Sequence, residues 1–391
     1  MKSSTTAILI VFVIFASTMT TALAAFVRIR MPNGPVNPDS YIIVLKSGTS
    51  MDDHIKNVAQ ISTRSPGSEF SVTHRYGILN GYSAHATGAS LARILICPEV
   101  DYVEADGIAP IGNDLHQVNE RDAMERDGVS VGMGDILGGN WGGLGVDIYV
   151  LDTGVNVKHI CFDKRAFVGP TFGNYVNIDT DGHGTHIAGI AAGRPYGIAT
   201  RARIISVKVA SGRMSVFSTN LIGGINYASY ESRQTGRPSI ALICASLDFS
   251  RTVNRAVSTA ISWGLHIVVS AGNNGLDASK FSPASSDEAI TVGAFNTHSD
   301  MIASFSNHGS VVDVFAPGND IRSAWIGSLG ATMVSSGTGP AAAYVASLLA
   351  VVLSRDGQTT PANLSDQLKK HAAPLIDGQP WGTTDLMALL W

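Results

Sequence analysis

The stretch Val150-Leu151-Asp152-Thr153-Gly154 decides the fold, because an apolar run ends there in a carboxylate followed by a turn-forming glycine. Apolar strands of this kind are typical of parallel sheets that helices cover on both faces. In such sheets the working residues lie beyond the carboxyl ends of the strands. A capping or turn aspartate would explain Asp152 equally well if the motif stood alone.

Apolar strand patterns alternate with helical patterns from residue 146 to residue 353. The alternation predicts an α/β fold with a mainly parallel central sheet and right-handed crossovers. The run Val345–Leu353 is too short to span a bilayer and is predicted to be a buried helix. The predicted strands are Asp147–Leu151, Arg203–Val209, Ser239–Ala245, His266–Val269, Ala289–Ala294 and Val311–Phe315, and the predicted helices are His183–Gly193, Ser218–Tyr230, Asn254–Gly264 and Pro340–Leu353.

Residues 1–24 are predicted to be a secretory signal peptide, so the protein is expected to be secreted and extracellular. Lys2 gives a positive start, Ala7–Ala16 is apolar but too short to span a bilayer, and Ala22-Leu23-Ala24 is a cleavage pattern. A membrane anchor or a buried helix is the alternative. Residues 25–36, which contain two prolines and a glycine, are predicted to be a linker.

Residues 37–108 are predicted to form a small α+β domain, and residues 109–391 a second, larger one. The smaller domain has about 70 residues, near the lower size for independent folding. Its predicted strands are Tyr41–Leu45, Gly81–Ala86 and Asp101–Glu104, with helical patterns near 52–60 and 90–97.

The composition is that of a globular protein, with 45% hydrophobic and 15% charged residues. The net charge is -4 and no basic block occurs, which argues against a nucleic-acid partner. Five glycines between 138 and 145 precede a strand instead of following one, so they indicate a surface turn and not a dinucleotide-binding loop. Of the three cysteines, Cys161 and Cys244 could pair, although two buried free thiols are the simpler interpretation.

Two further motifs carry side chains suited to catalysis. Asp181-Gly182-His183-Gly184-Thr185-His186 opens a helix with a histidine, and a histidine oriented by a carboxylate is a general base suited to neutral pH. His183 and His186 could instead bind a metal, but the glutamate of a zinc-protease helix is missing between them. Ser270–Gly275 follows a strand, and Asn273 there could donate to a developing oxyanion, although alone it would be a turn residue.

These motifs occur in the order Asp, His, Asn along one predicted sheet. In that order the chain resembles the subtilisin-like serine proteases, and the proteinase K branch most closely. The resemblance implies a three-layer fold preceded by an inhibitor-type propeptide domain, and it implies the catalytic aspartate, histidine and oxyanion asparagine at Asp152, His183 and Asn273. Later segments that resemble the family are Ser304–Ser310, Phe315–Gly318, Ser323–Gly327 and Gly382–Leu386.

The fourth motif departs from the family. Where the family has S-G-T-S-M-A-T-P-H-V-A-G, this chain has Ser336-Gly337-Thr338-Gly339-Pro340-Ala341-Ala342-Ala343-Tyr344-Val345-Ala346-Ser347. Matching residues on both sides fix the alignment, so the position of the nucleophilic serine falls on Gly339. A glycine followed by proline still allows a helix to start, but it supplies no hydroxyl group.

The expected substrate cleft departs from the family as well. The family's S-L-G-G-type segment is replaced by Ser246, Leu247, Asp248 and Phe249, and the last two are expected to place side chains where a peptide would lie. On the other side of the cleft, Met214-Ser215-Val216 stands where the family has glycines.

A calcium site is a further expectation from the resemblance. Asp313 falls on a calcium-binding aspartate of the family, close to carbonyl groups around residues 287–289. Ca²⁺ takes six to eight oxygen ligands, so a strand-end aspartate explains Asp313 equally well. No cofactor is expected to be required.

The sequence therefore predicts a secreted subtilisin-family pseudoprotease with a peptide-binding or regulatory role. Its expected partners are a peptide or protein ligand and its own propeptide-like domain in cis, with no membrane attachment after signal removal. The alternative is an active serine endopeptidase that hydrolyses peptide bonds through an Asp-His-Ser triad, in which either the helix start aligns differently with the family or the gene model is wrong near residues 331–345. A decayed relative without a selected role is a third interpretation.

Overall fold

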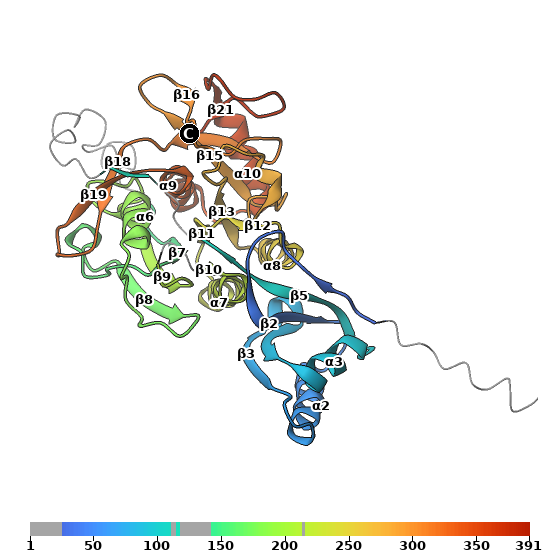
Figure 1. Cartoon of the computed structure of the whole chain (residues 1–391). Coiled ribbons are helices and arrows are strands. Elements are labelled where there is room, and N and C mark those ends of the chain that lie inside the picture. Colours follow the sequence, from blue (N-terminus) through green and yellow to red (C-terminus); the bar gives the residue numbers. More distant parts are fainter. Residues whose placement is uncertain (1–25, 111–114, 118–141, 213–215) are drawn as a thin grey trace, which may run out of the picture.

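The computed structural model describes residues 26–110, 115–117, 142–212 and 216–391 (Figure 1). The predicted signal peptide 1–24 lies outside this part, as do Met214 and Ser215. In the described residues a small α+β unit packs against a larger unit, in which two layers of helices enclose a sheet.

The larger unit is built on a ten-stranded, mostly parallel sheet. Its central strands β7 (Asp147–Asp152) and β11 (Ser239–Ile243) are buried along their whole length, and they pair in register from Asp147↔Ser239 to Leu151↔Ile243. The antiparallel strands β16 (Met301–Ile302) and β20 (Ala373–Pro374) lie at its margin. The remaining strands, all parallel, are in spatial order β21 (Leu386–Met387), β17 (Val314–Pro317), β15 (Ile290–Asn296), β13 (His266–Ser270), β11 (Ser239–Ile243), β7 (Asp147–Asp152), β9 (Arg203–Lys208) and β8 (Ala166–Thr171).

Helices cover both faces of this sheet (Figure 1). One face is packed by α6 (His183–Ala192) and α9 (Thr338–Asp356), and the other by α7 (Ser218–Thr235) and α8 (Arg251–Ser262). A shorter helix, α10 (Pro361–His371), buries Leu364 and Leu368 against the α9 side. The three-layer fold expected from the sequence is therefore confirmed.

Helix α9 is long and apolar enough to cross a membrane, and no other helix among the described residues is. Of its most apolar window, 83% is buried inside the protein. The helix packs against β11, β13, β15 and β17, as a core helix does. The prediction that Val345–Leu353 is buried is confirmed.

The small unit is a sheet with two helices on one side, α2 (Met51–Arg64) and α3 (Gly88–Ile96). Within the segment 25–36, predicted to be a linker, Ile29 and Arg30 form a parallel strand on β5 (Val100–Ala109). The edge of β5 that does not pair with β2 accepts this segment, and Val27 N donates to Leu95 O in the helix Gly88–Ile96. The strands in order are β1 (Ile29–Arg30), β5 (Val100–Ala109), β2 (Val36–Leu45), β4 (Gly81–Ala86) and β3 (Phe70–Tyr76).

The two units share one apolar cluster. Ile42, Tyr76 and Tyr102 of the small unit belong to the same cluster of buried residues as Leu221 of α7 and Val257 of α8. Because these side chains lose their contact with water only when the units are together, the interface is held by the hydrophobic effect.

Two buried carboxylates of β5 reach the amino ends of the helices beneath it. Asp106 accepts hydrogen bonds from Thr219 N (3.0 Å) and Thr219 Oγ1 (3.1 Å) at the start of α7. Glu104 accepts from Thr252 Oγ1 (2.8 Å) and from Ser250 Oγ at the start of α8. Carboxylates at helix amino ends satisfy unpaired backbone N–H groups and suit the helix dipole, so they fix where β5 lies.

The chain continues from the small unit across the larger one. The end of β5 pairs antiparallel with β10 (Val216–Phe217), with Ala109 opposite Val216. A few residues later, β6 (Leu115–Gln117) pairs antiparallel with β19 (Thr332–Ser336). The predicted domain boundary between 108 and 109 therefore falls inside a continuous strand, since pairing with β10 extends β5 to Ala109.

Candidate active site

The carboxyl end of β7 and the amino end of α6 bring Asp152 and His183 together. His183 Nδ1 lies 2.8 Å from Asp152 Oδ1, and both side chains are 1% exposed. The helix can come this close because an added Cβ at Gly184 would lie 2.1 Å from the carbonyl oxygen of Gly154. A carboxylate in this position fixes the ring and the tautomer of a histidine.

Burial raises the pKa of Asp152, and the neighbouring His183 and the Thr153 N–H oppose this rise. The Thr153 N–H donates to Asp152 Oδ1 over 2.7 Å. Since the hydrogen bond to His183 stabilises the ionised form, the pair can hold a charged carboxylate beside the imidazole despite its burial.

Asp179 supports the pair and was not singled out in the sequence. Its Oδ1 accepts from Thr153 Oγ1 (2.9 Å) and Gly182 N (2.9 Å), and its Oδ2 accepts from Thr185 N (3.0 Å). Asp179 therefore ties the loop after β7 to the first turn of α6. Its place four residues before His183, at the start of a helix, was the available signal, because aspartate is a favoured capping residue.

Lys208 is a second neighbour that sequence reasoning missed. This lysine at the end of β9 is 1% exposed, and its ammonium donates to Thr153 O. Burial lowers the pKa of Lys208, while Asp179 and Asp152 oppose the shift. A buried ammonium group close to two carboxylates offsets part of their charge.

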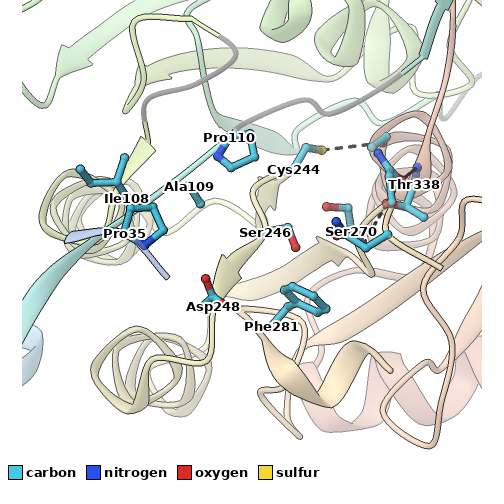
Figure 2. Close-up of a pocket in the computed structure, with 14 residues that line it drawn as sticks. Pro35, Ile108, Ala109, Pro110, Cys244, Ser246, Asp248, Ser270, Phe281 and Thr338 are labelled. Carbon is cyan, nitrogen blue, oxygen red and sulfur yellow. Dashed lines mark hydrogen bonds between the residues drawn. The ribbon is translucent and has the colours of Figure 1, made fainter. Parts of the chain in front are cut away.

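A pocket of about 180 Å³ lies beyond the ends of the central strands (Figure 2). Four of the residues singled out in the sequence are among those that line it: Asn273, Gly339, Ser246 and Asp248. Neither Asp152 nor His183, Leu247, Phe249 or Val216 is among the lining residues. The other lining residues are Pro35, Ile108, Ala109, Pro110, Cys244, Ser270, Gly272, Asn274, Phe281 and Thr338.

The amino end of α9 meets the loop after β13 at this pocket. The carboxamide oxygen of Asn273 accepts from Thr338 N and Thr338 Oγ1, both over 2.8 Å. Thr338 Oγ1 in turn accepts from Gly272 N over 3.0 Å. Next to Thr338, the carbonyl oxygen of Gly339 lies 3.7 Å from the thiol of Cys244 (Figure 2).

The hydroxyl groups of Ser336 and Thr338 precede Gly339 in sequence, and both have partners of their own. Ser336 Oγ accepts from Asp320 N (2.8 Å) and donates to Asp320 Oδ1 (3.4 Å). Thr338 Oγ1 is held between Asn273 and Gly272, as described above. These bonds direct the two hydroxyls toward the loops that contact α9.

The small unit supplies one wall of the pocket (Figure 2). Ile108 N donates to Pro35 O over 2.9 Å, so residues of the predicted linker line the pocket together with the end of β5. An added Cβ at Gly34 would lie 2.0 Å from Asp248 Oδ2, which shows that the Asp248 carboxylate packs against this backbone. The segment that contains Gly34 and Pro35 therefore fills space on this side of the pocket.

The other predicted cleft residues have separate positions. Leu247 is 2% exposed and pairs in β12 (Leu247–Asp248) with β14 (Phe281–Ser282). Phe249 is 49% exposed, and Phe281 lines the pocket in its place. Phe281 carries no signal in the sequence, because only the pairing of β12 with β14 brings it there.

Asp313, the predicted calcium ligand, lies just before β17. Its Oδ2 accepts from Thr291 N over 2.9 Å, and its Oδ1 lies 3.3 Å from the Lys369 ammonium of α10. Burial raises the pKa of Asp313, and the Thr291 N–H and Lys369 oppose the rise. A cationic group of the protein thus already faces this carboxylate.

The three cysteines are all buried free thiols, so Cys161 and Cys244 are not paired in the structure.

A parallel sheet between two layers of helices, with an aspartate–histidine pair at the strand ends, defines a subtilisin-type protein. The chain matches the Subtilase family model over residues 143–385 and the peptidase inhibitor I9 model over residues 40–111. This protein belongs to the subtilisin-like protease family and carries an inhibitor-type propeptide domain.

Similar proteins agree with this assignment. Subtilisin-like protease 2 of Pseudogymnoascus destructans is 35% identical over 387 residues, covering 93% of this chain and 92% of that protein. Subtilisin-like protease 4 of Trichophyton equinum is 37% identical over 385 residues, covering 93% and 94%. Among solved structures, a cold-adapted subtilisin-like serine proteinase matches with a TM-score of 0.60 and 35% identity, covering 64% of this chain and 91% of that one.

Proposed function

We propose that this protein is a catalytically inactive member of the subtilisin-like family, in which Gly339 stands where the family has its nucleophilic serine. In this proposal Asp152 and His183 keep the places of the catalytic aspartate and histidine, and Asn273 that of the oxyanion donor. The observation that carries it is the lack of a hydroxyl at residue 339, at the amino end of α9.

The neighbouring hydroxyls do not replace the missing one. A base must reach its nucleophile within hydrogen-bond distance. The Ser336 hydroxyl is engaged with Asp320, and the Thr338 hydroxyl with Asn273 and Gly272. For either to react, these bonds would first have to break, and the helix start would have to change its conformation.

The cleft supports the same proposal. The end of β5 lies beside β10, and the Asp248 carboxylate packs against Gly34. Glycine at position 248 would let a peptide backbone approach, whereas a carboxylate fills that space. We infer that the protein is secreted with its propeptide-like domain attached, and that a regulatory or peptide-binding role requires this segment to leave first.

The test is labelling by a fluorophosphonate probe that modifies activated serines. We expect no stoichiometric labelling of the purified full chain and no cleavage of casein. His183→Ala is the matched control, because labelling that survives removal of the histidine is not active-site chemistry. Stoichiometric labelling at any residue of 335–339 that His183→Ala abolishes would instead establish the alternative, an active serine endopeptidase.

A further inference from the structure

We propose a binding site for a Zn²⁺ ion on the propeptide-like domain, formed by His54, Cys97 and Glu99. His54 belongs to α2 and Cys97 follows α3, two helices that Figure 1 shows on the small unit, and none of the three residues lines the pocket. Their candidate ligand atoms all lie within 4.8 Å of one another. Nothing in the proposed function of the cleft uses them.

The three donor atoms have the spacing of a tetrahedral zinc site. Cys97 Sγ lies 3.6 Å from His54 Nδ1 and 3.6 Å from Glu99 Oε2, and His54 Nδ1 lies 3.0 Å from Glu99 Oε2. Zinc bonds of about 2.3 Å to sulfur and about 2.0–2.2 Å to nitrogen or oxygen, at tetrahedral angles, place the sulfur about 3.5 Å from the other donors and those about 3.3 Å apart. An ion would therefore fit with only small shifts.

The backbone already holds these ligands in place. Cys97 directly follows the last residue of α3, where its N–H donates to Ile94 O (3.2 Å) and its carbonyl accepts from Val100 N (3.1 Å). Glu99 O accepts from Lys46 N over 2.9 Å. His54 belongs to the first turn of the rigid helix α2, so little conformational entropy is lost on binding.

Charge and access also suit a divalent ion. One thiolate, one carboxylate and a neutral imidazole give Zn²⁺ a complex without net charge, which a partly buried site tolerates. His54 and Cys97 are 1% and 4% exposed, whereas the Glu99 side chain is 49% exposed. The Glu99 carboxylate therefore keeps one side of the cluster in contact with solvent, and binding would release the thiol proton.

A reactive cysteine is the weaker interpretation of the same cluster. Burial raises the pKa of the Cys97 thiol, whereas reactive cysteines have a lowered pKa. His54 Nε2 is buried with no hydrogen-bond partner in the part of the chain that the structure describes. Because zinc-bound histidines normally donate their second N–H, we expect weaker affinity than in closed four-ligand zinc sites.

The experiment titrates the reduced, chelator-treated full chain with Co²⁺, which reports a thiolate ligand by a charge-transfer absorption band. We expect one equivalent to bind with this band, Zn²⁺ to displace it, and Zn²⁺ to raise the melting temperature. Cys97→Ser should abolish the band, and Glu99→Gln should weaken Zn²⁺ binding at least about tenfold. Cys161→Ser and Cys244→Ser are the matched controls and should retain the band.

A band that persists in Cys97→Ser, or that is lost in either control, would overturn the proposal, as would the absence of stoichiometric binding. If Cys97→Ser fails to unfold cooperatively, Glu99→Gln decides, because its half-exposed side chain can change without disturbing the fold. Unaltered Zn²⁺ affinity in Glu99→Gln would then refute the three-ligand site.

Discussion

At the scale of single residues, function depends on which atoms are present and on what already engages them. The aspartate–histidine pair is complete in geometry, with 2.8 Å between Asp152 Oδ1 and His183 Nδ1. Under the proposed function, the chain lacks the third member of the triad, the serine, at residue 339. Triad members act as a unit, and loss of the serine costs about a million-fold in turnover, a magnitude measured on a subtilisin.

Restoring the hydroxyl alone should recover little activity. We expect Gly339→Ser to hydrolyse casein at least about a hundred-fold more slowly than an active family member, because positioning errors near 1 Å carry that cost and Asp248 and the end of β5 still fill the cleft. Gly339→Ala is the control, since it adds a side chain without a hydroxyl. A robust protease from the single serine substitution would contradict the description of an obstructed cleft.

His266 should make stability depend on pH. Both of its ring nitrogens are buried with no partner among the described residues, and burial lowers its pKa to about 4. The unfolded chain, with an ordinary histidine pKa near 6.5, then binds the extra proton, so stability falls by up to about 3 kcal/mol as the pH drops from about 6.5 to about 4.

The measurement is urea unfolding across this pH range. We expect His266→Leu to reduce the slope of the unfolding free energy against pH by up to the equivalent of one bound proton, and His298→Gln, at an exposed position, is the matched control. If the unfolding free energy depended on pH with the same slope in His266→Leu and in the unmodified protein, the His266 ring would not be the source of the pH dependence.

At the scale of elements, sequence periodicity predicted what local residues specify. The buried strands β7 and β13 and the helices α6 and α9 occur within a few residues of their expected bounds, because apolar runs and glycine or proline signals define them. β1, β3 and β8 were not predicted, since their polar or short segments become strands only by pairing with a neighbour.

The residues of the candidate site also fall into two groups, those on local sequence motifs and those that only long-range pairing brings to the pocket. Asp152, His183, Asn273 and Gly339 lie on motifs that a reader of the sequence can find. Phe281, Pro35 and Ile108 reach the pocket only through pairings between distant segments, so no local pattern could reveal them.

The link between α10 and the sheet should not need calcium. The Lys369 ammonium lies 3.3 Å from Asp313 Oδ1, so a calcium chelator should leave the melting temperature unchanged. Lys369→Met should lower the free energy of unfolding by about 1 kcal/mol, since the pair is partly exposed and screened. The exposed neighbour Lys370→Met is the control, and a large chelator effect on the unmodified protein would restore the calcium hypothesis for Asp313.

At the scale of the whole molecule, the two units behave as one body. Their apolar cluster is continuous, and Glu104 and Asp106 bond to the amino ends of α8 and α7. We therefore expect a single cooperative unfolding transition, with no stage at which the small unit melts alone.

Maturation follows from the proposed loss of the nucleophile. We expect the protein made in a protease-deficient host to begin near Ala25 and to keep the segment from about 106 to 113 intact, because under the proposed function the chain has no nucleophile with which to cut it. Intact mass and amino-terminal sequence measure this. A new amino terminus within that segment, formed by pure protein at a rate independent of concentration, would reveal self-cleavage and a nucleophile elsewhere.

The position of β5 beside β10 has a consequence for competition. Because that strand is tethered to the molecule whose pocket it lines, it is present there at an effective concentration of about a millimolar or more. A free peptide of ordinary affinity at micromolar concentration would lose to it. Cutting the tether would not by itself empty the cleft, since the shared apolar cluster retains the severed piece. Opening the cleft would then require two successive events. A protease must cut the segment, and the severed piece must afterwards dissociate or be degraded.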